Sequence, residues 1–90
     1  MNRLIIFTLN GCGHCQQFKQ KLNEQSIPFS EFDVDQNQEL WNQVVDQTGN
    51  ELLPAFFIKK ENSDTGPVFC PEKDFNDDDQ AIAIIKKYLI

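Results

Sequence analysis

The spacing of apolar and polar residues along this 90-residue chain changes several times, and each change predicts a new element. The apolar run from Leu4 to Thr8 is bounded by polar residues, which fits a strand buried on both faces. The segment from Phe29 to Val34 alternates apolar and polar positions, as a half-buried strand does. Two further apolar runs, 55–58 and 67–70, flank a polar turn, so we expect them to form a hairpin.

Helical spacing fills the segments between and after these strands. We expect a first helix from His14 to about Gln25, with its buried stripe at Cys15, Phe18 and Leu22. A second helix should begin from an N-cap at Asp35, run to about Thr48 and end at Gly49, with inward positions at Leu40, Trp41, Val44 and Val45. A third should span Asp77 to Leu89, with Ile82, Ile85 and Leu89 buried.

The resulting order of elements is β-α-β-α-β-β-α. A helix between consecutive strands implies a parallel pair, and the hairpin adds an antiparallel pair. The sequence therefore predicts an α/β fold, with a mixed four-stranded sheet and three flanking helices. We expect residues 1–90 to form a single domain.

Net charge and hydropathy exclude several partners. The formal charge of −6 leaves no basic patch to neutralise phosphates, so we expect no nucleic-acid partner. The first apolar run stops after four residues, which is too short for a secretory signal or a membrane span. We expect a cytoplasmic monomer without a membrane partner.

Two of the three cysteines, Cys12 and Cys15, stand where a loop becomes the first turn of a helix. Unpaired N–H groups at a helix N-terminus stabilise an anion, so the Cys12 thiolate should be favoured. Cys15 lies one turn later on the same side and should be the more buried, resolving thiol. Gly13, with Gly11, gives the loop backbone freedom. A protonated His14 would further favour the thiolate and make the couple more oxidising.

This arrangement predicts thiol–disulfide exchange, in which Cys12 attacks a disulfide and Cys15 then releases the reduced partner. A zinc site completed by His14 or Cys70 is the alternative, although no second Cys-x-x-Cys pair or His-x₃-His is present. We interpret Cys70 as a small buried hydrophobe, its alternative being a third redox thiol.

The strand followed by Cys12-Gly13-His14-Cys15, together with Leu53-Pro54 before a later strand, resembles the glutaredoxins within the thioredoxin superfamily. The Cys-Gly-His-Cys spelling is itself similar to that of protein disulfide isomerase domains. The resemblance implies a thioredoxin-like fold and a cis Leu53–Pro54 bond beside the disulfide, where Leu53 backbone groups pair with an incoming cysteinyl chain.

The resemblance also implies glutathione as the recycling thiol and disulfide-containing proteins as partners, without a metal. Asp78 and Asp79, at the start of the last helix, would meet the glutamyl end of glutathione, and Lys19 or Gln17 its glycyl carboxylate. An iron–sulfur cluster bridged between two chains is a further option within the family.

Two departures from the family pattern leave alternatives open. Glutaredoxins often have a basic residue three positions before the first cysteine, where Leu9 stands here, and a Gly-Gly pair where this chain has Phe69-Cys70-Pro71. Both features help to bind glutathione. A thioredoxin reductase could therefore recycle the protein, or it could act as a disulfide oxidant or isomerase. A metal-binding or partner-binding module without catalysis is the alternative from another class.

Overall fold

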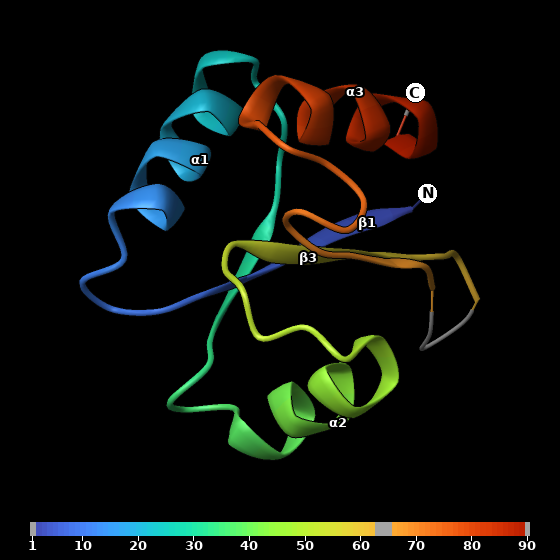
Figure 1. Cartoon of the computed structure of the whole chain (residues 1–90). Coiled ribbons are helices and arrows are strands. Elements are labelled where there is room, and N and C mark those ends of the chain that lie inside the picture. Colours follow the sequence, from blue (N-terminus) through green and yellow to red (C-terminus); the bar gives the residue numbers. More distant parts are fainter. Residues whose placement is uncertain (1, 63–65, 90) are drawn as a thin grey trace.

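The computed structural model describes residues 2–62 and 66–89, and its elements follow the predicted order. They are β1 (Arg3–Thr8), α1 (Gly13–Glu24), β2 (Ser30–Asp33), α2 (Gln38–Thr48), β3 (Ala55–Lys59), β4 (Val68–Phe69) and α3 (Asp78–Leu89). Figure 1 shows α1 and α3 on one side of the sheet and α2 alone on the other.

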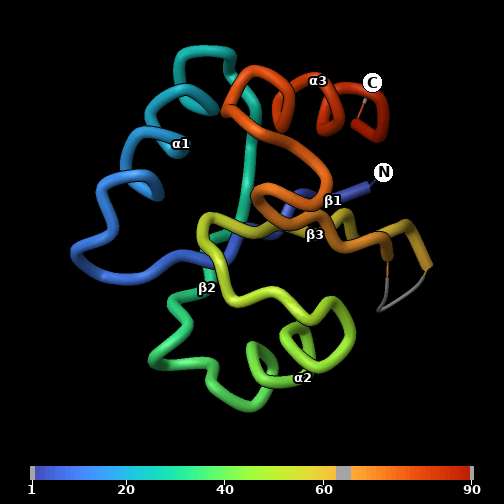
Figure 2. Tube along the Cα trace, viewed as in Figure 1, coloured from blue at the N-terminus to red at the C-terminus, as the bar shows by residue number. Residues whose placement is uncertain are grey.

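The four strands are ordered β2-β1-β3-β4, so β1 occupies an interior position. It pairs in parallel with β2 and antiparallel with β3, and the β3–β4 hairpin is antiparallel, which confirms the predicted mixed sheet. The chain crosses from β1 to β2 through α1, as Figure 2 traces along the backbone. This crossover places the β1–α1 junction at the carboxyl end of β1.

Alternation along the interior strands divides the core into two layers. Leu4 and Ile6 of β1 join Phe18 and Leu22 of α1 in a layer that also includes Phe56, Ile58, Phe75, Ala81, Ile82 and Ile85. On the other face, Phe7 packs 5.3 Å from the Trp41 ring, within the layer that α2 covers. The predicted α1 stripe is confirmed, since Cys15, Phe18 and Leu22 are all buried.

The start of α2 differs from the prediction. Asn37, not Asp35, is the N-cap residue, and its side chain makes no capping hydrogen bond. The Asp33 carboxylate instead accepts from the Asp35 backbone N–H at 2.8 Å, forming a local turn that delays the helix. Gly49 ends α2 in the left-handed region (φ 67°), as predicted for a C-terminal cap.

The remaining boundaries shift by one or two residues. β2 is shorter than the predicted Phe29–Val34 strand, although Val34 is buried and its N–H donates to the Thr8 carbonyl. Asp77, where we expected the third helix to begin, precedes α3 and caps it by accepting from the Gln80 N–H at 2.8 Å. Part of the predicted polar turn, residues 63–65, lies outside the described residues.

Candidate active site

Cys12 lies between the end of β1 and the start of α1, where it is the N-cap residue of the helix. Gly11 enters this turn with a positive φ of 87°, a conformation that favours glycine. The Cys12 N–H donates to the Leu9 carbonyl at 3.0 Å, closing the turn. The sequence thus positions the cysteine at the positive end of α1, as predicted.

Cys15 lies on the first turn of α1 and forms a disulfide with Cys12 across a Cα–Cα distance of 5.3 Å. Its backbone N–H donates to the Cys12 sulfur at 3.2 Å. Cys15 is 1 % exposed, whereas Cys12 is partly exposed. The unequal burial agrees with the predicted division between an attacking and a resolving thiol.

The two residues between the cysteines, Gly13 and His14, are exposed. A methyl group added at Gly13 would meet no atom within 4 Å, so the space above the first turn of α1 is open.

The Leu53–Pro54 peptide bond is cis, as the resemblance implies. Phe7 pairs with Ala55 in the antiparallel β1–β3 ladder, so the next residues along each chain, Thr8 and Pro54, lie at the same end of the two strands. Cys12 follows four residues after Thr8. The fold therefore brings Pro54 and the disulfide to one end of the sheet.

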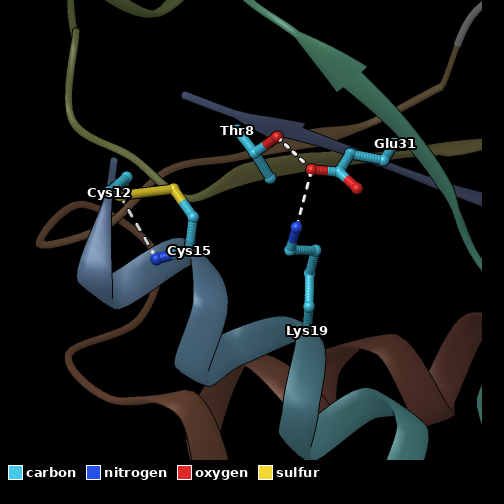
Figure 3. Close-up of a disulfide and its surroundings, with 5 residues drawn as sticks. All are labelled: Thr8, Cys12, Cys15, Lys19 and Glu31. Atoms are coloured by element: carbon cyan, nitrogen blue, oxygen red, sulfur yellow. Dashed lines mark hydrogen bonds and ion pairs between the residues drawn. A yellow bond between two sulfur atoms is a disulfide. The ribbon is translucent and has the colours of Figure 1, made fainter. Parts of the chain in front are cut away.

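Three polar side chains, whose contact no sequence motif predicted, lie beside this end. The Thr8 hydroxyl, on a residue only 2 % exposed, donates to Glu31 Oε2 at 2.6 Å, and Lys19 Nζ contacts the same oxygen at 2.9 Å. Figure 3 shows Lys19 reaching from α1, one turn beyond Cys15, toward Glu31 on β2. The Thr8 hydrogen bond and then the Lys19 ammonium hold the pKa of the Glu31 carboxyl below its usual 4.5.

This Thr8–Glu31–Lys19 contact links α1 to two strands and fixes the helix that carries both cysteines. The single signal for it in the sequence is the polar Thr8 at the end of a buried apolar run. Since Lys19 is paired with Glu31, its ammonium is already engaged, which counts against the expected contact with a glycyl carboxylate.

The residues predicted to meet the glutamyl end of glutathione also make contacts within the chain. Asp78 Oδ2 lies 3.9 Å and Asp79 Oδ1 3.6 Å from Lys21 Nζ. The acidic start of α3 thus forms ion pairs with α1. Both described lysines of α1, Lys19 and Lys21, contact carboxylates.

Cys70 is fully buried as a free thiol in the layer that α2 covers. Burial raises the pKa of this thiol above its ordinary value of 9.0, and the Asp74 carboxylate acts in the same direction, while a hydrogen bond to Thr48 and the charge of Lys73 partly offset both. The structure confirms the prediction of a small buried hydrophobe. Across residues 2–62 and 66–89, no group of three or more His, Cys, Asp or Glu side chains is arranged to hold a metal ion.

Comparisons with known proteins agree with this geometry. The sequence profile of the Glutaredoxin family matches residues 4–62, which include both cysteines and Pro54. The chain belongs to the glutaredoxin family. Family membership and the fold support a thiol–disulfide oxidoreductase.

Among individual proteins, the chain is similar to the N-acetyl-S-hydroxy-L-cysteine reductase of Bacillus subtilis (strain 168). The two are 27% identical over 63 residues, which are 70% of this chain and 68% of that protein.

The fold is shared with solved structures. A glutaredoxin from Brucella melitensis has a TM-score of 0.57 and 24% identity, covering 94% of this chain and 79% of that one. The thioredoxin of Malassezia sympodialis has a TM-score of 0.65 and 20% identity, covering 97% and 74%. These neighbours confirm the thioredoxin-like α/β fold. Within the described part of the chain, no helix is long and apolar enough to cross a membrane.

Proposed function

We propose that this chain is a dithiol glutaredoxin that reduces protein disulfides and glutathione mixed disulfides in the cytoplasm, as a monomer, with glutathione as the recycling thiol. The observation that carries this proposal is the unequal burial of the two sulfurs at the N-terminus of α1. Cys12 is partly exposed and caps the helix, whereas Cys15, on the first turn of the same helix, is only 1 % exposed.

The reaction follows from these positions. The Cys12 thiolate attacks one sulfur of a substrate disulfide, the substrate S–S bond breaks, and the departing thiolate takes up a proton. The Cys15 thiolate then attacks the Cys12 sulfur and releases the second substrate thiol, leaving the Cys12–Cys15 disulfide. Two glutathione molecules return the protein to its dithiol form and become glutathione disulfide.

The N-terminus of α1 lowers the free energy needed to deprotonate the Cys12 thiol. The Cys15 N–H already donates to the Cys12 sulfur, and the dipole of α1 adds to its effect. His14, the remaining residue of the motif with a titratable side chain, is exposed and would favour the thiolate when protonated. The backbone groups of Leu53 would pair with the cysteinyl chain of the substrate, beside cis-Pro54.

Recycling by a flavoprotein reductase is the second candidate, and local charge favours it. Lys19 and Lys21 of α1 contact Glu31 and the aspartates of α3, and Leu9 is exposed next to Cys12. Glutathione has two carboxylates and needs cationic partners. A reductase that docks through apolar contacts does not need cationic partners on this chain.

The name of the Bacillus subtilis relative suggests a small substrate as well. Attack of the Cys12 thiolate on the sulfur of an S-hydroxycysteine derivative would displace hydroxide and form the same mixed disulfide, which Cys15 would resolve. This substrate is a useful third probe.

The discriminating experiment measures turnover of a small disulfide by the purified protein with NADPH and either glutathione plus glutathione reductase, or thioredoxin reductase alone. The proposal predicts turnover with glutathione. Negligible turnover with glutathione and efficient turnover with thioredoxin reductase would overturn the glutathione part in favour of the second candidate. Protein purified without reductant should contain the Cys12–Cys15 disulfide, whereas stoichiometric zinc and free thiols would point to a metal-binding module.

A further inference from the structure

Two large hydrophobic side chains are exposed among the described residues, Leu9 at 37% and Leu52 at 44%. Single exposed hydrophobic residues are common on soluble proteins and need no explanation. Here, however, both belong to the segments that meet at the disulfide end of the sheet.

The register of the sheet brings these segments together. Phe7 of β1 pairs with Ala55 of β3 in an antiparallel ladder, so Leu9, two residues beyond Phe7, leaves the sheet beside the segment that contains Leu52. The Leu9 carbonyl accepts from the Cys12 N–H at 3.0 Å. The backbone of Leu9 is therefore tied to the backbone of Cys12, in the turn that leads to the attacking cysteine.

The backbone of Leu52 is held in place by Asn50, in the loop before β3. Its backbone N–H donates to Asn50 Oδ1 at 2.7 Å, and Asn50 Nδ2 donates to the Pro71 carbonyl at 3.0 Å. The side-chain amide of Asn50 thus fixes the loop before cis-Pro54, and the Leu52 side chain remains exposed.

The segment of the chain that leads to Leu52 is acidic. No lysine or arginine lies between Lys21 and Lys59, whereas the segment 33–51 includes Asp33, Asp35, Glu39, Asp46 and Glu51. This segment consists of α2 and its flanking loops, and α2 covers its face of the sheet alone (Figure 1). Glu51 is exposed directly beside Leu52, and Asp33 pairs with Thr8 at the end of β1.

We propose that Leu9, Leu52 and the acidic segment 33–51 form a docking surface for protein disulfides whose reacting cysteine has an apolar neighbour and nearby lysine or arginine residues. The inference rests on the proposed function, since it describes the substrate of the same sulfur. Apolar contact with the leucines holds the substrate sulfur near Cys12, and opposite charge speeds the encounter. An anionic substrate gains no such electrostatic acceleration.

The test uses three synthetic peptides, each with one cysteine in mixed disulfide with 2-mercaptoethanol. The first has Leu beside the cysteine and Lys further out, the second replaces Leu with Ser, and the third replaces Lys with Glu. The reduced protein, in excess, converts each peptide disulfide to peptide thiol and free 2-mercaptoethanol while Cys12 and Cys15 are oxidised. Stopped-flow fluorescence or quenched chromatography gives the second-order rate constants at low and high salt.

We expect the Leu/Lys peptide to react about 5-fold faster than the Leu/Glu peptide at low salt, with a smaller ratio at high salt because salt screens exposed charges. We expect it to react about 3-fold faster than the Ser/Lys peptide at either salt concentration, because burying part of two leucine side chains favours binding. Equal rates for all three peptides would overturn the proposal.

Variants assign each preference to its residues. Leu9→Ser and Leu52→Ser should each reduce the preference for the leucine peptide, and Leu9→Met should retain it. Asp35→Asn with Glu51→Gln should reduce the charge preference, whereas Glu24→Gln, an exposed charge change at the far end of α1, should leave every ratio unchanged. An unchanged ranking in both leucine variants would overturn the role of the leucines.

The small uncharged bis(2-hydroxyethyl) disulfide separates this proposal from the proposed function. If the protein reduces it but treats the three peptides alike, the exchange activity holds and the docking surface is wrong. If it reduces no disulfide at all, the proposed function is itself wrong.

Discussion

The backbone N–H of Cys15 donates to the sulfur of Cys12 at 3.2 Å, so the sulfur takes the place that a serine or aspartate oxygen takes at other helix N-termini. A hydrogen bond from an N–H group is stronger to a thiolate than to a thiol. The helix that holds the resolving cysteine therefore also stabilises the attacking one.

Replacing His14 tests its electrostatic role. His14→Tyr should lower the reduction potential by about 10–20 mV, since it removes a side chain that would stabilise the thiolate by about 0.5–1 kcal/mol when protonated. Equilibration with a glutathione redox buffer, followed by thiol trapping, gives the potential. His14→Gln is the control that removes the imidazole without adding a phenol ring, and it should act in the same direction. An unchanged or raised potential in both variants would discard the role of His14.

The Glu31 carboxylate should make stability depend on pH. Its pKa is lowered in the folded protein, so its contribution is fully present above the unfolded pKa of 4.5 and is lost as the pH falls through the lower folded value. Glu31→Gln should cost up to about 1 kcal/mol at neutral pH, a modest effect because the side chain is 38% exposed. Urea unfolding at neutral pH and at about pH 3 measures the difference.

Glu24→Gln is the matched control for this pH dependence, since it removes an exposed carboxylate from the C-terminal end of α1. It should change neither the stability nor its variation with pH. If Glu31→Gln costs as much at low pH as at neutral pH, the contact acts through packing and not through charge.

The thiol of Cys70 should be unreactive in the folded protein. It is fully buried and its pKa is raised, so iodoacetamide at neutral pH should alkylate Cys12 first in the reduced protein and leave Cys70 unmodified until the protein unfolds. Peptide mapping by mass spectrometry identifies the modified residue. Alkylation of Cys70 at a rate similar to that of Cys12 would instead support a third redox thiol.

Truncating Phe56 should test the core layer beneath α1 and α3. The ring is fully buried and lies 5.2 Å from Phe69, 5.5 Å from Phe75 and 6.0 Å from Phe18, measured between centroids. Phe56→Ala should therefore cost about 3–5 kcal/mol of unfolding free energy. Gln17→Ala, on the exposed side of α1, should cost less than about 0.5 kcal/mol in the same denaturation experiment.

Local patterns predicted the elements and the cysteine pair because their signals lie within a few residues. The stripe of Cys15, Phe18 and Leu22 has the period of a helix, and Gly49 ends α2 where a left-handed residue is needed. The prediction of Asp35 as the N-cap was wrong, because the nearby Asp33 carboxylate accepts from the Asp35 N–H and forms a local turn before the helix. Pattern alone does not decide between such neighbours.

The contacts around the site depend on register, which the sequence does not show. Thr8 and Glu31 are 23 residues apart, and they meet because β1 and β2 pair in parallel. Leu9 and Leu52 approach one end of the sheet only because Phe7 pairs with Ala55. The sequence predicted the reacting sulfurs, whereas the surface around them required the structure.

Replacing the resolving cysteine gives the most direct test of the central claim, which is that Cys12 attacks and Cys15 resolves. Cys15→Ser, reduced and then treated with glutathione disulfide, should accumulate a mixed disulfide with one glutathionyl group on Cys12, identified by intact mass and peptide mapping. Cys12→Ser should form no such adduct at Cys15 and have no activity. An adduct at Cys70, or the absence of any adduct in Cys15→Ser, would contradict the account.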